Sequence, residues 1–423
     1  MSNTPTCPSY LRPLLTLFSS HGQRAYPVGG CVRDTLLGTA PHDWDLAVTT
    51  IPEDTMSICE TAGYRTIPTG LKHGTVTVLV PHSGDPADRE GSYDLIECTT
   101  CRTEGGYSDG RHPDAVSFTG RIRDDLARRD FTVNAMAFTD EGAHGEVLSV
   151  LDLFGGQEDL QNRVIRAVGD PDTRFSEDAL RLMRAVRFAM KLGFSIEEDT
   201  RAAIVRRAHG LARISRERIS DEFQKILTGP HPEEGVSMLI DLGLMPYVLP
   251  RGISAEGMGN LSALPPDLSA RTACLLWGMA EGDLTANLAG LRLSNSLRKD
   301  ILTLAGSITL PADPSPYSAR LWRYSLGTLA IPAVALRGAR PAANMVVLRD
   351  LAELIRASET RREAVNVSDL AIGGSDLIAL GCKPGKGIRD LLDALLYAVW
   401  ANPELNTKDA LLDEAKRRME EGL

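Results

Sequence analysis

The feature that most constrains this chain is a change in its hydrophobic pattern near residue 159. Residues 25–150 contain short runs of β-forming residues separated by Gly, Pro, Asp and Ser, a pattern typical of strands and turns. Further along, Leu182, Val186 and Ala189 stand at positions i, i+4 and i+7, which is a helical spacing. The sequence therefore predicts an α+β N-terminal part with a small mixed sheet, followed by a long all-α part.

The same pattern predicts individual elements. Strands are expected over residues 25–28, 44–48, 75–80, 93–97 and 133–138, with a helix over residues 31–37. A longer helix is expected over residues 176–192, with Ser176 as its N-cap and Gly193 at its end. Further helices are predicted over residues 198–208, 215–227 and 233–242.

Composition narrows the class of protein. Of the 423 residues, 43% are hydrophobic and 24% are charged, which excludes a wholly disordered or fibrous chain. No run approaches the roughly 20 apolar residues of a membrane span. A secretory signal begins with basic residues, whereas no basic residue precedes Arg12 in this chain. We expect a cytoplasmic protein with seven reduced cysteines. The net charge is −10, yet residues 161–228 carry 14 basic and 10 acidic side chains, which is compatible with an RNA partner.

The first motif with chemical content joins a glycine pair to two aspartates. Gly29 and Gly30 lie between a predicted strand and a predicted helix, with Arg33 just beyond, and glycine allows a phosphate to approach the backbone closely. Asp43 and Asp45 are two residues apart on the next predicted strand, so their carboxylates share one face. Such a pair repels itself unless a cation lies between the two groups, and Mg²⁺ prefers oxygen ligands. The alternative is a turn followed by two solvated acids.

A second motif, Arg128-Arg129-Asp130, is followed by Asn134. Paired arginines can hold phosphate oxygens, and Asp130 can accept a hydrogen bond from a ribose hydroxyl. Taken alone, the same residues are common in a solvated surface turn.

A third motif, Asp178-x-x-Arg181, continues with Arg184 and Arg187. On a helix Asp178 and Arg181 would share one face and could offer acceptors and donors to the edge of a base. The alternative is a surface ion pair of at most about 1 kcal/mol. Earlier in the chain, Lys72 and His73 lie between two glycines, either as a hairpin turn or as a basic turn near a triphosphate or primer.

Together these motifs resemble those of the class II (bacterial-type) tRNA nucleotidyltransferases, the CCA-adding enzymes, which share a superfamily with bacterial poly(A) polymerases. The resemblance is ordered and nearly gapless over about residues 26–227. It implies that Asp43 and Asp45 hold two Mg²⁺ ions. The residues that it assigns to the nucleotide are Gly29, Gly30, Arg33, Arg128, Arg129, Asp130, Asn134, Asp178, Arg181, Arg184 and Arg187.

Within that set, the resemblance makes Asp178 and Arg181 the pair that selects CTP and then ATP. Residues 152–156 resemble a flexible hinge, and residues 213–219 resemble a motif that supports the selecting helix. Among family members a third acidic position lies on a neighbouring strand. Glu97 is our candidate, although Asp94 on the opposite strand face is the alternative. Trp44 occupies a place where an aliphatic residue is expected.

The resemblance also implies the larger organisation. We expect a nucleotidyltransferase head over residues 1–152, a helical neck over 153–228, a helical body over 229–296 and a helical tail over 297–423. The tail would bind tRNA through Lys383 and Lys386, and Lys72 and His73 would also contact RNA. The substrates would be CTP, ATP and tRNA, with no obligate protein partner and no membrane.

Several related activities share these motifs. The loop over residues 104–118 is of full length, which favours complete CCA or A-only addition over CC-only addition, and residues 69–75 favour CCA addition over poly(A) synthesis. Two different classes of protein also use parts of this pattern, namely small-molecule nucleotidylyltransferases and RNA-binding modules with a decayed site. All eight histidines lie at or before His231, so an added metal-dependent phosphohydrolase domain is not expected, and Cys98-x-x-Cys101 lacks a second pair for zinc.

Overall fold

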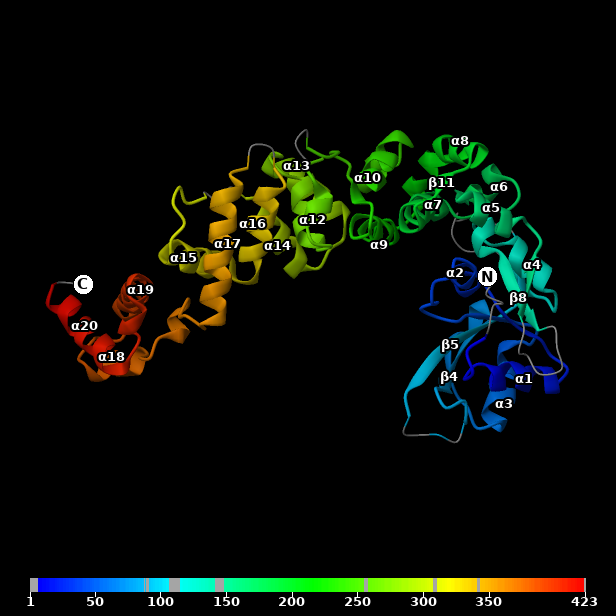
Figure 1. The fold of residues 1–423 in the computed structure, drawn as a ribbon, viewed down its shortest axis with the longest axis horizontal. Coiled ribbons are helices and arrows are strands. Elements are labelled where there is room, and N and C mark those ends of the chain that lie inside the picture. Colours follow the sequence, from blue (N-terminus) through cyan, green and yellow to red (C-terminus); the bar gives the residue numbers. More distant parts are fainter. Residues whose placement is uncertain are drawn as a thin grey trace. The chain divides into compact units, whose positions relative to one another are not determined.

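The computed structural model of the protein describes residues 7–86, 88, 91–105, 115–140, 148–254, 258–306, 310–340 and 343–421. The chain divides into two compact units, Met1–Pro250 and Arg251–Leu423. Figure 1 labels the elements of both units and colours them in sequence order. The finer divisions predicted at residues 152, 228 and 296 stay predictions. Among the described residues, no helix combines the length and the apolar character that crossing a bilayer requires.

A five-stranded mixed sheet forms the centre of the N-terminal part, in the order β1-β2-β5-β4-β3. The strands are β1 (Ala25–Pro27), β2 (Leu46–Val48), β3 (Arg65–Gly70), β4 (Thr75–Pro81) and β5 (Tyr93–Thr100). Only β2 and β5 run parallel; the other neighbours are antiparallel. Val76, Val78 and Val80 of β4 are fully buried. Helices α1 (Arg12–Ser20) and α3 (Pro52–Thr61) pack against each other and on this sheet. The predicted α+β class is confirmed.

Two predicted strands differ from the structure. The strand predicted from residue 44 begins at Leu46, so Asp43 and Asp45 precede β2 rather than lie on it, although Trp44 is buried between them as the alternation requires. The strand predicted over residues 133–138 is a 3-10 turn, Thr132–Asn134, followed by β8 (Met136–Asp140). The turn forms because the backbone N–H groups of Asn134 and Ala135 donate to carbonyls three residues back.

Short elements lead from the sheet to the helical part. They are α2 (Gly30–Leu36), the pair β6 (Arg102–Gly105) and β7 (Ala115–Phe118), α4 (Ile122–Ala127), and β9 (Leu148–Asp152), which pairs with β8. After β9 the chain turns sharply into α5 (Gly156–Asn162). Gly155 has φ of +79°, and a Cβ on Gly156 would lie 2.4 Å from the Thr132 carbonyl oxygen. The Asp152 carboxylate accepts from the N–H groups of Phe154, Gly156 and Gln157, which fixes this turn.

The helix predicted over residues 176–192 is two helices, α6 (Pro171–Glu177) and α7 (Leu180–Leu192). Ser176 lies inside α6 and does not cap a helix; Asp170 is the N-cap, accepting from Thr173 N–H at 2.7 Å, with Pro171 in the first turn. The break falls at Asp178, whose backbone is extended. Its carboxylate accepts from Leu180 N–H at 3.0 Å, and this bond competes with continuation of the helix.

The rest of the first unit is helical apart from one strand pair. The helices are α8 (Glu198–Arg207), α9 (Arg216–Leu227), α10 (Pro232–Asp241) and α11 (Met245–Val248). The two-residue strands β10 (Val164–Ile165) and β11 (Ser195–Ile196) pair in parallel, an exception to the predicted all-α neck. α7 packs on both α9 and α10.

The second unit, as far as the structure describes it, consists of helices, as predicted. They are α12 (Leu268–Leu275), α13 (Glu281–Gly290), α14 (Asn295–Ala305), α15 (Pro316–Leu326), α16 (Ala330–Gly338), α17 (Met345–Thr360), α18 (Gly374–Ala379), α19 (Lys386–Ala401) and α20 (Lys408–Glu420). Its C-terminal core is built on fully buried Leu377, Leu395, Trp400 and Leu411.

Candidate active site

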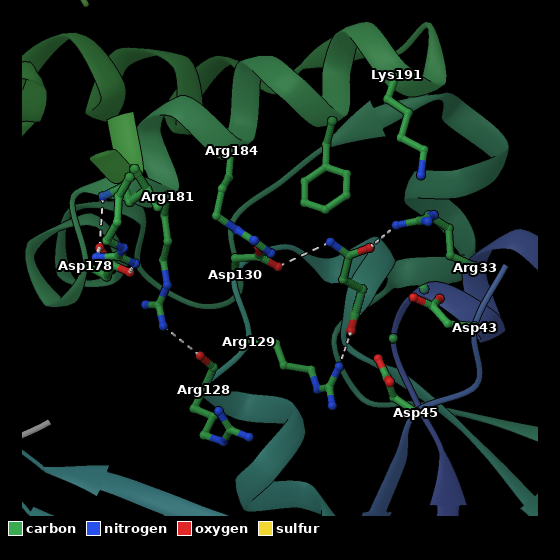
Figure 2. Close-up of a pocket in the computed structure, with 16 residues that line it drawn as sticks. Arg33, Asp43, Asp45, Arg128, Arg129, Asp130, Asp178, Arg181, Arg184 and Lys191 are labelled. Carbon is green, nitrogen blue, oxygen red and sulfur yellow. Dashed lines mark hydrogen bonds and ion pairs between the residues drawn. The ribbon is translucent and has the colours of Figure 1, made fainter. Parts of the chain in front are cut away.

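A polar cleft of about 510 Å³ lies within the first unit, between the N-terminal sheet region and α7 (Figure 2). It unites all three sequence motifs that were predicted to bind metal or nucleotide. Its lining consists of Gly29, Gly30, Arg33, Asp43, Asp45, Arg128, Arg129, Asp130, Asn134, Asp178, Leu180, Arg181, Arg184, Phe188, Lys191 and Arg218.

The glycine pair makes room for an arginine in the cleft. Gly29 has φ of +77°, a conformation that disfavours other residues. A Cβ on Gly29 would also lie 2.6 Å from the Arg129 Nη1 atom. The N–H of Gly29 donates to the Met136 carbonyl at 3.1 Å, which ties the start of α2 to β8.

Three carboxylates gather at the end of β2. The parallel register pairs Leu46 with Cys98, so Asp45, which immediately precedes β2, lies next to Glu97 of β5. Burial, followed by the charges of Asp43 and Glu97, raises the pKa of Asp45 to about 6, although Asp45 remains open to solvent from the cleft. Glu97 does not line the cleft itself. Asp94, the alternative third acid, instead forms an ion pair with His82 at 3.0 Å.

Asn134 connects the middle of the cleft. Its Oδ1 accepts from Arg33 Nη1 at 2.6 Å, its Nδ2 donates to Asp130 Oδ1 at 3.2 Å, and its carbonyl accepts from Arg129 Nη1 at 3.3 Å. In Figure 2, dashed lines from Arg33, Arg129 and Asp130 run into the space between these three residues. Because each bond joins a different side chain, Asn134 fixes the relative positions of two arginines and one aspartate.

Acidic partners orient the arginines in this region. Buried Asp125 pairs with Arg128 at 2.6 Å and with Arg129 at 3.2 Å. Asp130 pairs with Arg184 of α7 at 2.6 Å. Burial alone would raise the pKa of Asp130, but the charge and hydrogen bond of Arg184 outweigh it and lower that pKa to about 2. Asp130 therefore stays ionised, with both oxygens already engaged by protein donors.

Asp178 and Arg181 line the opposite end of the cleft from Asp43, as Figure 2 shows, but they do not form the predicted pair. Asp178 lies in the break between α6 and α7, and its Oδ2 accepts from Arg218 of α9 at 2.8 Å. Arg181 pairs with Glu177 and donates to the Arg128 carbonyl at 3.1 Å. The prediction of a shared helix face was wrong because the helix begins only at Leu180.

The structure does not bring every predicted residue to the cleft. Arg187 is absent from its lining and instead pairs with Glu222 at 2.6 Å. Lys72 and His73 form an exposed 3-10 turn in the β3–β4 hairpin, outside the cleft. Lys383 and Lys386 are exposed residues of the second unit. Most of the 104–118 loop lies outside the described residues.

Sequence reasoning missed four residues of the site. Arg218 belonged to a motif that was noted but not assigned to the cleft, and Leu180, Phe188 and Lys191 were not considered as cleft residues. Arg184 and Arg187 lie over the Phe188 ring, with their guanidinium carbons 5.3 and 4.3 Å from its centroid. The spacing Arg184, Phe188 and Lys191 places all three on one face of α7, a signal that was available in the sequence.

The charge of the cleft defines what it can hold. Its lining carries six arginines and one lysine against four aspartates, an excess of positive charge on a chain with net charge −10. A polyanion fits such a cleft. Among the described residues, no three acidic, imidazole or thiol groups form a complete ligand set for a metal ion. A divalent cation at Asp43 and Asp45 would thus share its ligands with substrate phosphates and water, as Mg²⁺ commonly does.

The chain is similar to three family models. Residues 25–166 match the poly A polymerase head domain, residues 193–255 match the "Probable RNA and SrmB- binding site of polymerase A", and residues 270–415 match tRNA nucleotidyltransferase domain 2. Among curated proteins, the CCA-adding enzyme of Lactiplantibacillus plantarum is 36% identical over 414 residues, covering 96% of this chain and 95% of the relative. That of Geobacillus kaustophilus is 35% identical, covering 92% of both chains.

Solved structures show the same similarity. The Bacillus stearothermophilus CCA-adding enzyme in complex with CTP superposes with a TM-score of 0.77 at 32% identity, covering 98% of this chain and 100% of that one. The Thermotoga maritima CCA-adding enzyme complexed with tRNA shares the fold, with a TM-score of 0.67 at 21% identity, covering 97% of this chain and 94% of that one.

Proposed function

The chain belongs to the family of CCA-adding enzymes, and from this premise we propose that it adds CCA to the 3′ end of tRNA from CTP and ATP. The observation that carries this proposal is a single cleft with Asp43 and Asp45 at one end and Asp178 and Arg181 at the other. A nucleotide that spans the cleft has its phosphates beside the carboxylates and its base beside the selecting residues.

Asp43 and Asp45 are the residues that would hold magnesium. Burial, followed by the charges of Asp43 and Glu97, raises the pKa of Asp45, and a divalent cation beside the carboxylates would offset this penalty. Two bound Mg²⁺ ions would lower the pKa of the tRNA 3′-hydroxyl and neutralise the departing pyrophosphate. Glu97 supports the site from the neighbouring strand.

The arginines and Asp130 orient the nucleotide. Arg129 and Arg33, fixed by Asn134, present N–H groups for phosphate oxygens. Asp130 lies beside them, and a ribose hydroxyl would reach one of its oxygens in competition with the protein donors. Such prior fixing of donors reduces the entropy lost when substrate binds.

Asp178 and Arg181 are proposed to read the base. Asp178 keeps acceptor capacity besides its bond to Arg218, and Arg181 offers N–H donors, so together they complement the polar edges of cytosine and adenine. A base with the wrong polarity would leave buried polar groups without partners, which gives strong discrimination. Arg218 and Glu177 hold the two side chains apart and in place.

The test uses the purified full-length chain with tRNA transcripts that lack CCA, CA or only the final A. Each transcript is incubated with CTP, ATP or both, in the presence of Mg²⁺. The proposal expects C addition to the first, completion of all three with both nucleotides, and termination after A. Addition of A alone, of CC alone, or of a continuing A tail would assign the related activities, and no product at all would overturn the proposal.

The remaining proposals concern partners and location. tRNA binding by the second unit is expected to involve Lys383 and Lys386, with Lys72 and His73 as further RNA contacts on the first unit. All seven cysteines are free thiols, six of them buried, which supports the predicted cytoplasmic location.

A further inference from the structure

Lys191 differs from every other basic residue of the cleft. Each lining arginine forms an ion pair with an acid: Arg33 with Asp34, Arg128 and Arg129 with Asp125, Arg181 with Glu177, Arg184 with Asp130 and Arg218 with Asp178. Lys191 is exposed in the last turn of α7, and within the described part of the chain its ammonium group forms no ion pair or hydrogen bond.

Lys191 lies at the end of the cleft that contains Asp43. In Figure 2 its side chain points down towards Arg33, on the side of Asp43 and away from Asp178 and Arg181. Lys191 and Arg33 thus bring like charges to the same end, where an anion between them would relieve the repulsion. This is the end at which the proposed function places the nucleotide phosphates.

We propose that Lys191 binds the terminal phosphates of the incoming nucleoside triphosphate and the pyrophosphate formed from them. This inference rests on the proposed function and assigns Lys191 a role separate from base selection and metal binding. A lysine acts as a compact point charge on phosphate oxygens, so its contact does not depend on the base.

The role follows the bonds of the reaction. The tRNA 3′-oxygen forms a bond to the α-phosphorus and loses its proton to solvent, while the bond from the α-phosphorus to the bridging oxygen breaks. The bonding electron pair remains on that oxygen, so negative charge grows on the pyrophosphate. The positive charge of Lys191 stabilises this growing negative charge, as a cation near a leaving group does.

A tRNA phosphodiester is another source of phosphate near Lys191, because Lys191 also lines a second pocket of about 380 Å³ with Arg187 and Lys225. The charges of those two residues are already compensated by Glu222 and Asp221. The side chain of Lys191 points towards Arg33 of the cleft in Figure 2. We therefore place the phosphate on the cleft side of Lys191.

The experiment compares Lys191→Met and Lys191→Arg in the full-length protein, with Lys225→Met as a control on the neighbouring pocket. Calorimetry measures binding of ATP, AMP and inorganic pyrophosphate in the absence of tRNA. Lys191→Met is expected to weaken the binding of ATP and of pyrophosphate by about tenfold, because one charge-assisted hydrogen bond is lost. AMP binding stays unchanged in this variant, Lys191→Arg restores ATP and pyrophosphate binding, and Lys225→Met binds all three ligands as the wild type does.

Three results would overturn the inference. Equal weakening of AMP and ATP would indicate a structural role. A raised KM for tRNA with unchanged ATP and pyrophosphate binding would assign Lys191 to a tRNA phosphodiester. Unchanged values throughout would exclude any phosphate contact. Failure of the proposed function is distinguishable, because the wild-type protein would then bind ATP without extending any tRNA.

Discussion

Single residues in the cleft divide into those whose charge is compensated and those whose charge is not. Asp130 and Asp178 each pair with an arginine, whereas Asp43 and Asp45 form no ion pair with a described residue. The arginine partners hold these two acids in fixed orientations. The uncompensated pair costs folding stability in the absence of a cation, which is the usual mark of a functional position.

Replacing the Asp43 and Asp45 carboxylates by amides separates their effect on activity from their effect on stability. Asp43→Asn and Asp45→Asn are each expected to reduce incorporation of every nucleotide by at least about 100-fold, because a metal-stabilised charge is lost. Without metal, neither substitution lowers the unfolding temperature, since like-charge repulsion is removed. Primer extension and thermal unfolding measure the two effects.

Two further variants accompany that prediction. Glu97→Gln reduces activity by a smaller factor, while Asp94→Asn, whose acid pairs with His82, retains full activity. Normal turnover by Asp43→Asn or Asp45→Asn would remove the metal assignment.

Asp130 gives the stability of the protein a defined pH dependence. Its pKa falls from an ordinary value near 4 to about 2 in the folded state. The resulting stabilisation, on the order of 2 kcal/mol, is therefore complete above pH 4 and is lost as the pH falls from 4 towards 2. Asp130→Asn should be less stable than the wild type at pH 7 by about this amount, and the difference should vanish near pH 2. Urea unfolding of the wild type and of Asp130→Asn, measured between pH 2 and pH 7, tests this prediction. A stability difference between the two proteins that does not change with pH would contradict it.

Residue identities in the site were largely predictable from the sequence, but residue partnerships were not. Short motifs predicted ten of the sixteen lining residues as nucleotide contacts and both Asp43 and Asp45 as metal ligands. The bond between Asp178 and Arg218 joins residues 40 positions apart. Such contacts depend on how α7 packs on α9, which no local pattern encodes. Arg187 was misplaced for the same reason, because its carboxylate partner lies on α9.

At the scale of elements, the break between α6 and α7 determines the direction of the Asp178 carboxylate, and so how Asp178 would read a base under the proposed function. A continuous helix would have carried Asp178 on its face, whereas the break turns its carboxylate towards α9. The sequence held the information, since Asp170 followed by Pro171 is a strong helix start. The prediction instead followed the helical spacing of the apolar residues. That spacing is unchanged by a single extended residue, so it gave no sign of the break.

This arrangement predicts that Arg218 affects selectivity without being on α7. Arg218→Ala frees the Asp178 carboxylate and should lower the preference for CTP over UTP by about tenfold, with tRNA affinity unchanged. Lys225→Ala on the same helix, where the lysine pairs with exposed Asp221 at 2.6 Å, is the matched control. Competition assays with the two nucleotides measure the ratio. If both variants keep the wild-type preference, Arg218 has only a structural role.

At the scale of the whole molecule, charge is distributed unevenly. The chain is acidic overall, but the cleft is basic and the second unit exposes Lys383 and Lys386. Composition alone would have argued against a polyanion ligand. The fold class could be predicted because strand and helix periods separate cleanly along the chain. The unit boundary at Pro250 could not be predicted, because the sequence has helical patterns on both sides of it.

The salt dependence of tRNA binding tests the proposed role of the second unit. Replacing both Lys383 and Lys386 by Ala should weaken tRNA binding and reduce the slope of log Kd against log salt by about 1–2, since each phosphate contact releases counterions. ATP binding remains unchanged. Lys408→Ala, whose lysine is held by Asp376 at 2.8 Å, is the control in the same unit. A slope equal to that of the wild type would assign tRNA binding to other residues.

The central claim is that one cleft holds metal at Asp43 and Asp45 and chooses the base at Asp178 and Arg181. The most direct measurement is the kcat/KM ratio for CTP over UTP, with tRNA lacking CCA, for the wild type, Asp178→Ala and Arg181→Ala. We predict that the wild type strongly prefers CTP and that each variant loses at least about tenfold of this preference while tRNA affinity is retained. An unchanged ratio in both variants would contradict the claim.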